Sequence, residues 1–424
     1  MLLRQAPLRI DSEAMPFEWL AVAVLLAYAV REPFAGAVQY YLDQLHLGFL
    51  WFLPDAIGLI CVAALVVIDL VKFGSFKFPF FLCAIFYYML LGYVSIGSAA
   101  SSFSGFKALL PLFAGLMLSR PLLQRNYIQI ALTALLLLAM AGVWWSLKNT
   151  LPWAQLSFDS GLGVKQLRST IWAAGGTYRP FGFASDPHSA GSSIVFLFAL
   201  IGAGNARLLF YGLSVPVAMT VWASTSRTSF MALAILLLLR FVLDVLEKRD
   251  RPRLTELVTA VVPFLVICAP MCVMAFAQMY SANDVPGELF SLWIRGNEVF
   301  LQPFTLMPMF APNAWLFGFG LGGVGFPVIQ SNYASYSSII DNFLLFSYYS
   351  FGIPFLIFYF AMCLRNRLEA DFYKRILFCV TLIFGQFILG WANGMFMIVF
   401  GYAASASFLG GLSLRSPTLV GARS

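Results

Sequence analysis

An acid–amide pair, Asp341-Asn342, opens a long apolar segment directly after a polar, glycine-marked stretch. A carboxylate at the mouth of an apolar helix indicates chemistry at a bilayer surface, and the kind of chemistry depends on which other charges face the same side. Two further candidates for chemistry, Asp186 and His188, stand at the start of another apolar segment, where a neutral His can act as a base. Asp186 precedes Pro187, so the pair equally predicts a helix start with Asp as N-cap. His188 equally fits a polar residue in a wet vestibule.

Three arginines flank these candidates: Arg179, which follows Tyr178, then Arg227 and Arg295. Arginine makes bidentate, charge-assisted bonds to phosphate, so three of them near one membrane face favour an anionic ligand such as a lipid-linked pyrophosphate. Arg227 is equally explained by snorkelling at a membrane boundary, and Arg295 by a surface pair with Glu298 on an interfacial helix. No carboxylate cluster with metal-ligand spacing accompanies them, and we expect neither metal nor cofactor.

A glycine string at 318–325 matches G-x-G-x-x-G, which in a nucleotide site requires a preceding strand, a following helix and a suitably placed acid. We expect this string outside the cytoplasm, away from nucleotides. Glycines here are better explained by a tight turn or by close approach of the backbone to a ligand.

Composition decides which elements must position these residues. The chain is 61% hydrophobic and 11% charged, against roughly 25% charged in soluble domains. A spanning helix needs about 20 predominantly apolar residues, and continuous apolar runs predict helices because barrel strands alternate. The sequence therefore predicts one all-α polytopic membrane domain over 1–424 with about twelve spans. They are 17–34, 48–70, 78–97, 103–119, 126–147, 188–204, 207–224, 227–246, 255–278, 341–364, 373–391 and 394–412.

Basic residues set the expected orientation, because they stay on the cytoplasmic side. With both termini in the cytoplasm, 18 of the 26 basic residues fall in cytoplasmic segments. The net charge of +7 then reflects topology and lipid contact rather than nucleic acid. Two long loops, 148–187 and 279–340, are expected outside, and loops of this length are usually functional. The other eight basic residues are Arg31, Lys107, Lys148, Lys165, Arg168, Arg179, Arg227 and Arg295.

Targeting and cysteine signals are weak. Arg4 and Arg9 are followed by acids and then by a full-length apolar segment without a small-residue cleavage site, so we do not expect a signal peptide. The six cysteines all fall in predicted spans, where small apolar core residues are the simplest interpretation.

In these segments the chain resembles the O-antigen polymerase and ligase superfamily. The resemblance covers roughly 165–355 and lies in the order of several short elements. They are an R-x-x-G-x-x-x-(D/E)-P-like segment at 179–187, a T-x-S-R-(T/G) turn at 225–228, an arginine-bearing loop helix at Arg295, the glycine string, a (H/D)-N-x-x-L motif at 341–344 and the following Gly352.

The resemblance implies a GT-C-like glycosyltransferase in a bacterial inner membrane, with its site facing the periplasm. It would join undecaprenyl-diphosphate-linked oligosaccharide repeat units, with inversion and without a metal. Asp341 would be the base, with Asp186 and His188 in reserve. Arg179, Arg227 and Arg295, aided by Tyr178 and Asn342, would bind the pyrophosphate or glycan. A flippase and a chain-length regulator of the same pathway are expected partners.

Three other functions stay open. Ligases of the superfamily carry His where this chain has Asp341, which favours a polymerase of O-antigen or exopolysaccharide over a ligase. A flippase for lipid-linked oligosaccharides would also have about twelve spans, but such transporters usually carry charges within the spans. Asp55 and Lys107 are the nearest to such charges here. An assembly subunit of an export complex is the remaining alternative.

Overall fold

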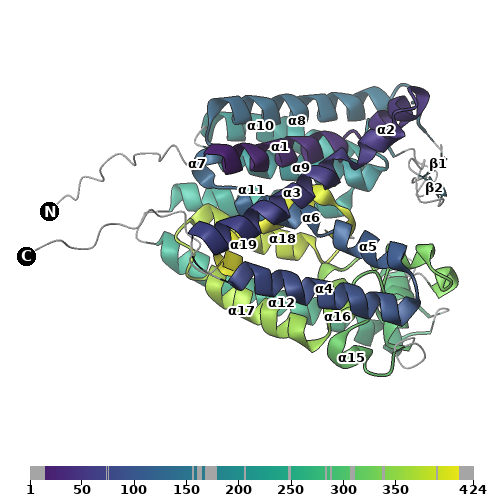
Figure 1. The fold of residues 1–424 in the computed structure, drawn as a ribbon. Helices are drawn as coiled ribbons and strands as arrows, with labels where there is room; N and C mark the ends of the chain where they lie inside the picture. The colour runs from purple at the N-terminus through teal and green to yellow at the C-terminus, as the bar shows by residue number, and fades with distance from the viewer. Residues whose placement is uncertain are drawn as a thin grey trace, which may run out of the picture.

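The computed structural model describes residues 15–409 except 73, 75, 155–156, 160–164, 168–178, 205–206, 247–249, 282–283, 287–288, 306–310, 337–339 and 388–389. Its longer helices run side by side as a bundle (Figure 1). The helices of the first half are α1 (Met15–Arg31), α2 (Ala35–Gln44), α3 (Leu53–Val67), α4 (Lys77–Ile96), α5 (Ala99–Lys107), α6 (Leu110–Met117), α7 (Arg120–Leu123), α8 (Asn126–Ser146) and α9 (Pro187–Gly202).

The second half contributes α10 (Arg207–Ala223), α11 (Arg227–Val245), α12 (Arg251–Met279), α13 (Phe290–Ile294), α15 (Ala314–Phe317), α16 (Phe343–Phe351), α17 (Ile353–Asn366), α18 (Phe372–Phe384) and α19 (Gly394–Leu409). Short 3-10 turns are η2 (Gly48–Phe52), η5 (Phe326–Gln330), η6 (Ala334–Tyr336) and η7 (Gly390–Ala392), and π-helical segments are η3 (Ile68–Lys72) and η4 (Arg295–Phe300). One antiparallel hairpin, β1 (Ser157–Asp159) with β2 (Lys165–Leu167), lies within the first predicted loop.

Six of the described helical segments are long and apolar enough to cross a membrane, which confirms a helical membrane protein in coarse terms. They are Gly48–Val71, Lys77–Ile96, Ala99–Met117, Asn126–Ser146, Arg227–Val245 and Arg251–Met279. The bent pair Trp19–Arg31 and Ala35–Gln44, which meets at 87°, would make a seventh.

The predicted count of twelve spans is not reached in the described residues. The other predicted spans correspond to shorter pieces: α9 has 16 residues, α18 has 13, and 341–364 divides into α16 and α17 at Gly352. A 16-residue helix rises about 24 Å, less than the roughly 30 Å hydrocarbon core. Hydropathy did not reveal the break at Gly352 because the residues on both sides of it are apolar.

The core of the bundle is formed by α9 and α19, whose described side chains are buried almost throughout. Helices around them expose large apolar side chains, such as Phe80 at 77% and Phe264 at 67%. In water such a surface would be costly, so it is the face that lipid would cover.

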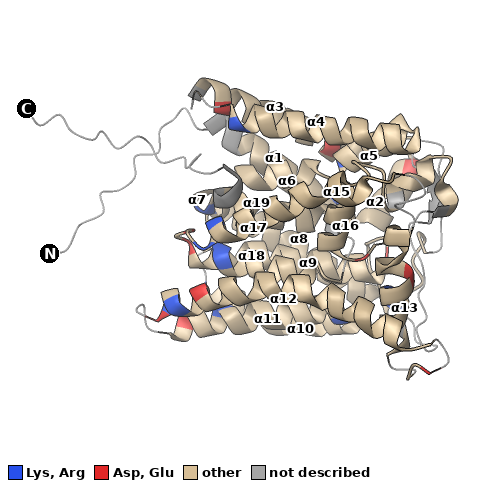
Figure 2. Ribbon diagram, turned by 90° about the horizontal axis from the view of Figure 1, so that it is seen from below, with Lys and Arg blue, Asp and Glu red and all other residues tan. Residues whose placement is uncertain are grey.

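Basic residues gather at one end of the bundle, where α10, α12 and α18 begin and α17 ends (Figure 2). We call this the basic end. It includes four arginines that line one cavity, Arg120, Arg207, Arg240 and Arg251. It also includes Arg253 in the first turn of α12, and Arg365, Arg367, Lys374 and Arg375 at the end of α17 and the start of α18. We call the opposite end, which carries α2, α13 and η4, the loop end. The grouping of basic residues at one end agrees with the charge pattern of the sequence.

The glycine string at 318–325 lies between helices rather than on the surface. The Leu321 N–H donates to the Tyr88 carbonyl of α4 at 2.8 Å, and the Ser101 hydroxyl of α5 donates to the Gly322 carbonyl at 2.7 Å. Gly322 has a φ of 82°, a conformation that favours glycine. The glycines therefore let the backbone of this string approach closely, and what it approaches is helices α4 and α5 of the protein itself.

Replacing Gly92 of α4 by alanine is expected to destabilise the protein by about 1–3 kcal/mol, the usual cost of overpacking. Its Cβ would lie 2.0 Å from the Leu321 carbonyl oxygen, so the string would have to shift. The melting temperature in detergent measures the effect. Gly212→Ala in α10 is the matched control, because nothing lies within 4 Å of its Cβ. An equal melting temperature for Gly92→Ala and wild type would contradict the packing argument.

Candidate functional site

Arg295 and Asp341 form an ion pair at the loop end. Arg295 Nε lies 3.0 Å from Asp341 Oδ2, and the two side chains are 35% and 22% exposed. The second carboxylate oxygen, Asp341 Oδ1, is buried and has no hydrogen-bond partner among the described residues. One oxygen of the acid is therefore held by arginine, while the other is left for a further donor.

The local backbone fixes both partners. Arg295 begins the π-helix η4, and π-helical turns are often found at functional sites. The next residue, Gly296, packs so closely on α12 that a Cβ would lie 2.6 Å from the Val273 carbonyl oxygen. On the other side, Asn342 caps α16 by accepting the Leu345 N–H at 3.0 Å. The residues that follow Arg295 and Asp341 in the chain are therefore fixed by packing and capping, and this fixes the backbone of both charged residues.

Arg179 is bound to the turn between α10 and α11. Its Nε donates to Thr225 Oγ1 at 2.5 Å and its Nη2 to the Thr225 carbonyl at 3.1 Å. Thr225 has a φ of 55°, which is unusual for a β-branched residue. Strained backbone of this kind clusters at functional sites. Arg227, exposed at the start of α11, lies near enough for its charge to act on Arg179.

The start of α9 brings the two reserve candidates to the same place. Asp186 is the N-cap and accepts bonds from the Ser189 N–H at 2.8 Å and the Ser189 hydroxyl at 2.5 Å. The helix-start interpretation of Asp186 is thus confirmed. His188 Nδ1 lies 3.4 Å from the Ser226 hydroxyl oxygen, and its ring stacks on Phe384.

Electrostatic interactions join these groups into one site. His188 lies within Coulombic range of two acids, Asp186 and Asp341, and of two arginines, Arg179 and Arg295. Burial raises the pKa of Asp341, and the charges of Arg295 and His188 offset this only in part. Burial likewise lowers the pKa of Arg179, against the opposing effect of Asp186.

The structure thus brings together six of the residues that the sequence singled out: Arg179, Asp186, His188, Arg227, Arg295 and Asp341. Arg295 pairs with Asp341 and not with Glu298. Asn342 is buried, with its amide donating to Gln386 Oε1 at 3.1 Å, so its visible role is to support α16. Tyr178 lies outside the described residues.

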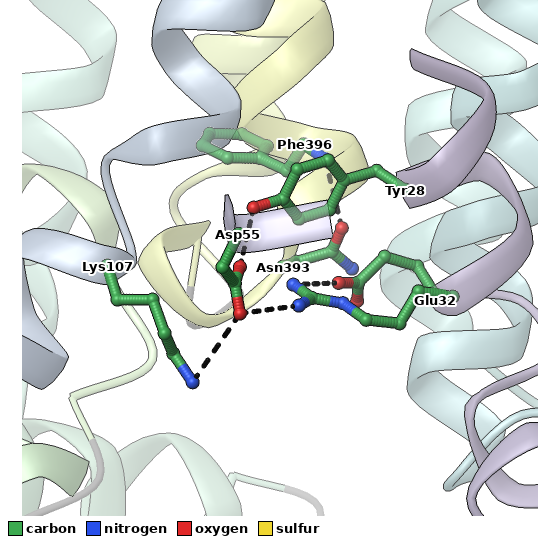
Figure 3. Close-up of polar contacts among 7 residues, drawn as sticks. Tyr28, Glu32, Asp55, Lys107, Asn393 and Phe396 are labelled. Atoms are coloured by element: carbon green, nitrogen blue, oxygen red, sulfur yellow. Dashed lines mark hydrogen bonds and ion pairs between the residues drawn. The ribbon is translucent and has the colours of Figure 1, made fainter. Parts of the chain in front are cut away.

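A second polar cluster was missed by sequence reasoning (Figure 3). Asp55 accepts from the Tyr28 hydroxyl at 2.7 Å and from Arg31 Nη1 at 2.9 Å, and Lys107 Nζ lies 3.8 Å away. Arg31 also pairs with Glu32 at 3.3 Å. The only sequence signal was that Asp55 and Lys107 are charged residues in apolar segments.

The segment from the end of α18 to the start of α19, described at 385–387 and 390–394, touches both clusters. Beside the candidate site, the Phe343 N–H donates to the Gly385 carbonyl at 2.6 Å. Asn393 donates to Ser192 of α9 at 2.9 Å. Gly394 donates its N–H to the Glu32 carboxylate. One segment therefore supports the candidate site and the Asp55 cluster together.

Among the residues that the structure describes, no group of three or more His, Cys, Asp or Glu side chains is placed to hold a metal ion. Arginines and one partly buried acid are suited to binding an anion and accepting a proton. Comparisons of the chain with protein-family models, with curated proteins and with solved structures find no match.

Proposed function

We propose that this protein is a bacterial polysaccharide polymerase of the inner membrane, with the loop end facing the periplasm. It would join undecaprenyl-diphosphate-linked oligosaccharide repeat units into O-antigen or exopolysaccharide. The observation that carries the proposal is the Arg295–Asp341 pair, with Asp341 Oδ1 unpartnered and His188 and Arg179 in electrostatic range.

The chemistry would be a single displacement at the anomeric carbon of the donor chain. A hydroxyl of the acceptor sugar forms the new C–O bond and gives its proton to the Asp341 carboxylate. The bond from the anomeric carbon to the phosphate oxygen breaks with inversion, and the lipid diphosphate leaves. Arg295 holds Asp341 through Nε, so its Nη groups remain for phosphate, and Arg179 and Arg227 would add charge stabilisation.

The burial of Asp341 suits this role. A general base works best when its pKa lies near the working pH, and burial raises the pKa of this carboxyl. Arg295 opposes this shift, because its positive charge lowers the pKa of Asp341. The arrangement resembles other sites in which an apolar environment tunes an acid for proton transfer.

A lipid-linked oligosaccharide transporter is the second candidate, favoured by the Asp55 cluster. Intramembrane charges that pair with one another mark translocation paths, and Arg31, Glu32, Asp55 and Lys107 form such a group. This second proposal does not use Arg295 or Asp341.

One experiment separates the two. We expect deletion of the gene to leave single lipid-linked repeat units on the outer side of the inner membrane, and purified protein in proteoliposomes to convert such units into a ladder of polymer. Repeat units trapped on the cytoplasmic side, with no ladder in vitro, would instead establish the transporter.

A further inference from the structure

Four arginines surround a cavity at the basic end, far along the bundle from the candidate site. The cavity has a volume of about 160 Å³. Its charged lining residues are Arg120, Arg207, Arg240, Arg251, Asp244 and Asp371. Four positive charges face two negative ones, so the lining keeps a net positive charge.

The ion pairs leave this excess unbalanced. Asp244 is shared by two arginines, with Arg240 Nε at 3.1 Å and Arg207 Nη2 at 3.5 Å. Asp371 pairs with Arg120 at 2.9 Å, while Arg120 Nε is buried without a hydrogen-bond partner among the described residues. Arg251 Nε donates to the Leu246 carbonyl at 3.2 Å. Two guanidinium charges thus remain without a carboxylate of their own in the described lining.

Three helix N-termini add to the positive potential of the cavity. α10 begins at Arg207, α12 at Arg251 and α18 at Phe372, and all three residues line the cavity. The start of a helix carries partial positive charge and unpaired N–H groups, which attract anions. Asp371 already caps α18 by accepting the Tyr373 N–H at 2.9 Å. The arginine side chains and the other two helix starts therefore act together on whatever enters.

We infer that this cavity binds one anionic phosphate group, supplied either by a phospholipid headgroup or by free phosphate. The volume of about 160 Å³ is several times the roughly 30 Å³ that one water molecule occupies, so the cavity has room for a phosphate group. Basic pockets between membrane helices are suited to anionic headgroups. The inference is independent of the proposed function, because it uses none of the residues of the candidate site.

Binding is tested on the full purified chain in detergent with three probes: phosphatidylglycerol, phosphatidylcholine and inorganic phosphate. Native mass spectrometry counts retained lipid, and the melting temperature reports stabilisation. We expect phosphatidylglycerol to be retained in preference to phosphatidylcholine. Arg207→Gln and Arg251→Gln should each weaken retention about tenfold, the loss expected for one charge-assisted contact.

The matched control is Arg253→Gln, since Arg253 lies at the same end but is 76% exposed and outside the cavity. Stabilisation by inorganic phosphate that both lining variants weaken would identify free phosphate as the ligand. Equal binding by wild type, Arg207→Gln and Arg251→Gln would overturn the inference. Absence of both lipid preference and phosphate stabilisation would do the same. Melting temperatures without ligand show whether each variant is folded.

Discussion

Asparagine in place of Asp341 is expected to lower the rate of polymer formation by about 10²–10⁴-fold, the range that general-base catalysis contributes. The amide keeps the shape of the carboxylate but cannot accept the proton of the acceptor hydroxyl. In the wild type, one carboxylate oxygen of Asp341, Oδ2, pairs with Arg295, and the other, Oδ1, has no hydrogen-bond partner among the described residues. Polymer length on gels, in a host that lacks its own polymerase, and ladder formation in proteoliposomes both measure the change.

Asp284→Asn is a suitable control, because Asp284 is an exposed acid in the same predicted loop and accepts a hydrogen bond from the nearby Ser281 hydroxyl. It should leave polymer length unchanged. Long polymer made by both Asp341→Asn and Asp341→Ala would remove Asp341 as the base and direct attention to His188.

The pH dependence of the wild type follows from the same carboxyl. Its pKa is raised above the ordinary aspartate value, and only the ionised form is a base, so activity should fall as pH drops through that raised pKa. Stability has the opposite sign, because a raised pKa favours folding at low pH and this contribution is lost as pH rises. Asp341→Asn should therefore not melt lower than wild type at pH 7, which separates lost chemistry from unfolding.

Glutamine in place of Arg295 is the second large effect, with an expected loss of about 10²–10³-fold in turnover, as for removal of one preorganised charge-stabilising donor. The substitution removes two contributions together: the positive charge near the departing diphosphate and the ion pair between Arg295 Nε and Asp341. Lysine should restore activity only in part, because it is a point charge without the planar fork of arginine.

A pH profile distinguishes this role from a merely structural one. The charge of Arg295 lowers the pKa of Asp341, so Arg295→Gln should move the acid limb to higher pH, and Arg295→Lys should leave it near wild type. Lys148→Gln, an exposed lysine just beyond the end of α8, is the control. Wild-type turnover with an unmoved acid limb in Arg295→Gln would exclude the proposed phosphate contact.

Much of the candidate site could be predicted from sequence because its members stand at element boundaries. Asp186 before Pro187 indicated a helix start, and the structure shows the cap. Asp341 and Arg295 were both placed on one side of the membrane by threading apolar segments, and they form an ion pair. What the sequence could not supply is the partner of each group, such as Thr225 for Arg179.

Span lengths and the second cluster were harder for physical reasons. Hydropathy cannot distinguish a helix that crosses lipid from a short helix buried by its neighbours, and α18 and α19 are of the second kind. In the Asp55 cluster, Arg31 and Asp55 lie 24 residues apart in the sequence. Asp55 and Lys107 lie about twice as far apart. No local pattern reports such contacts.

The glycine string between α4, α5 and α16 has a consequence for biogenesis. Ser101 of α5 donates a hydrogen bond to Gly322, which lies 221 residues further along the chain. During synthesis, α4 and α5 therefore emerge from the ribosome long before the glycine string that packs against them. Until that segment arrives, the buried Ser101 hydroxyl lacks its Gly322 partner, and unpaired polar groups in an apolar setting are costly. The nascent protein should therefore be a substrate for membrane chaperones up to about residue 325, and completion of the string should mark its release.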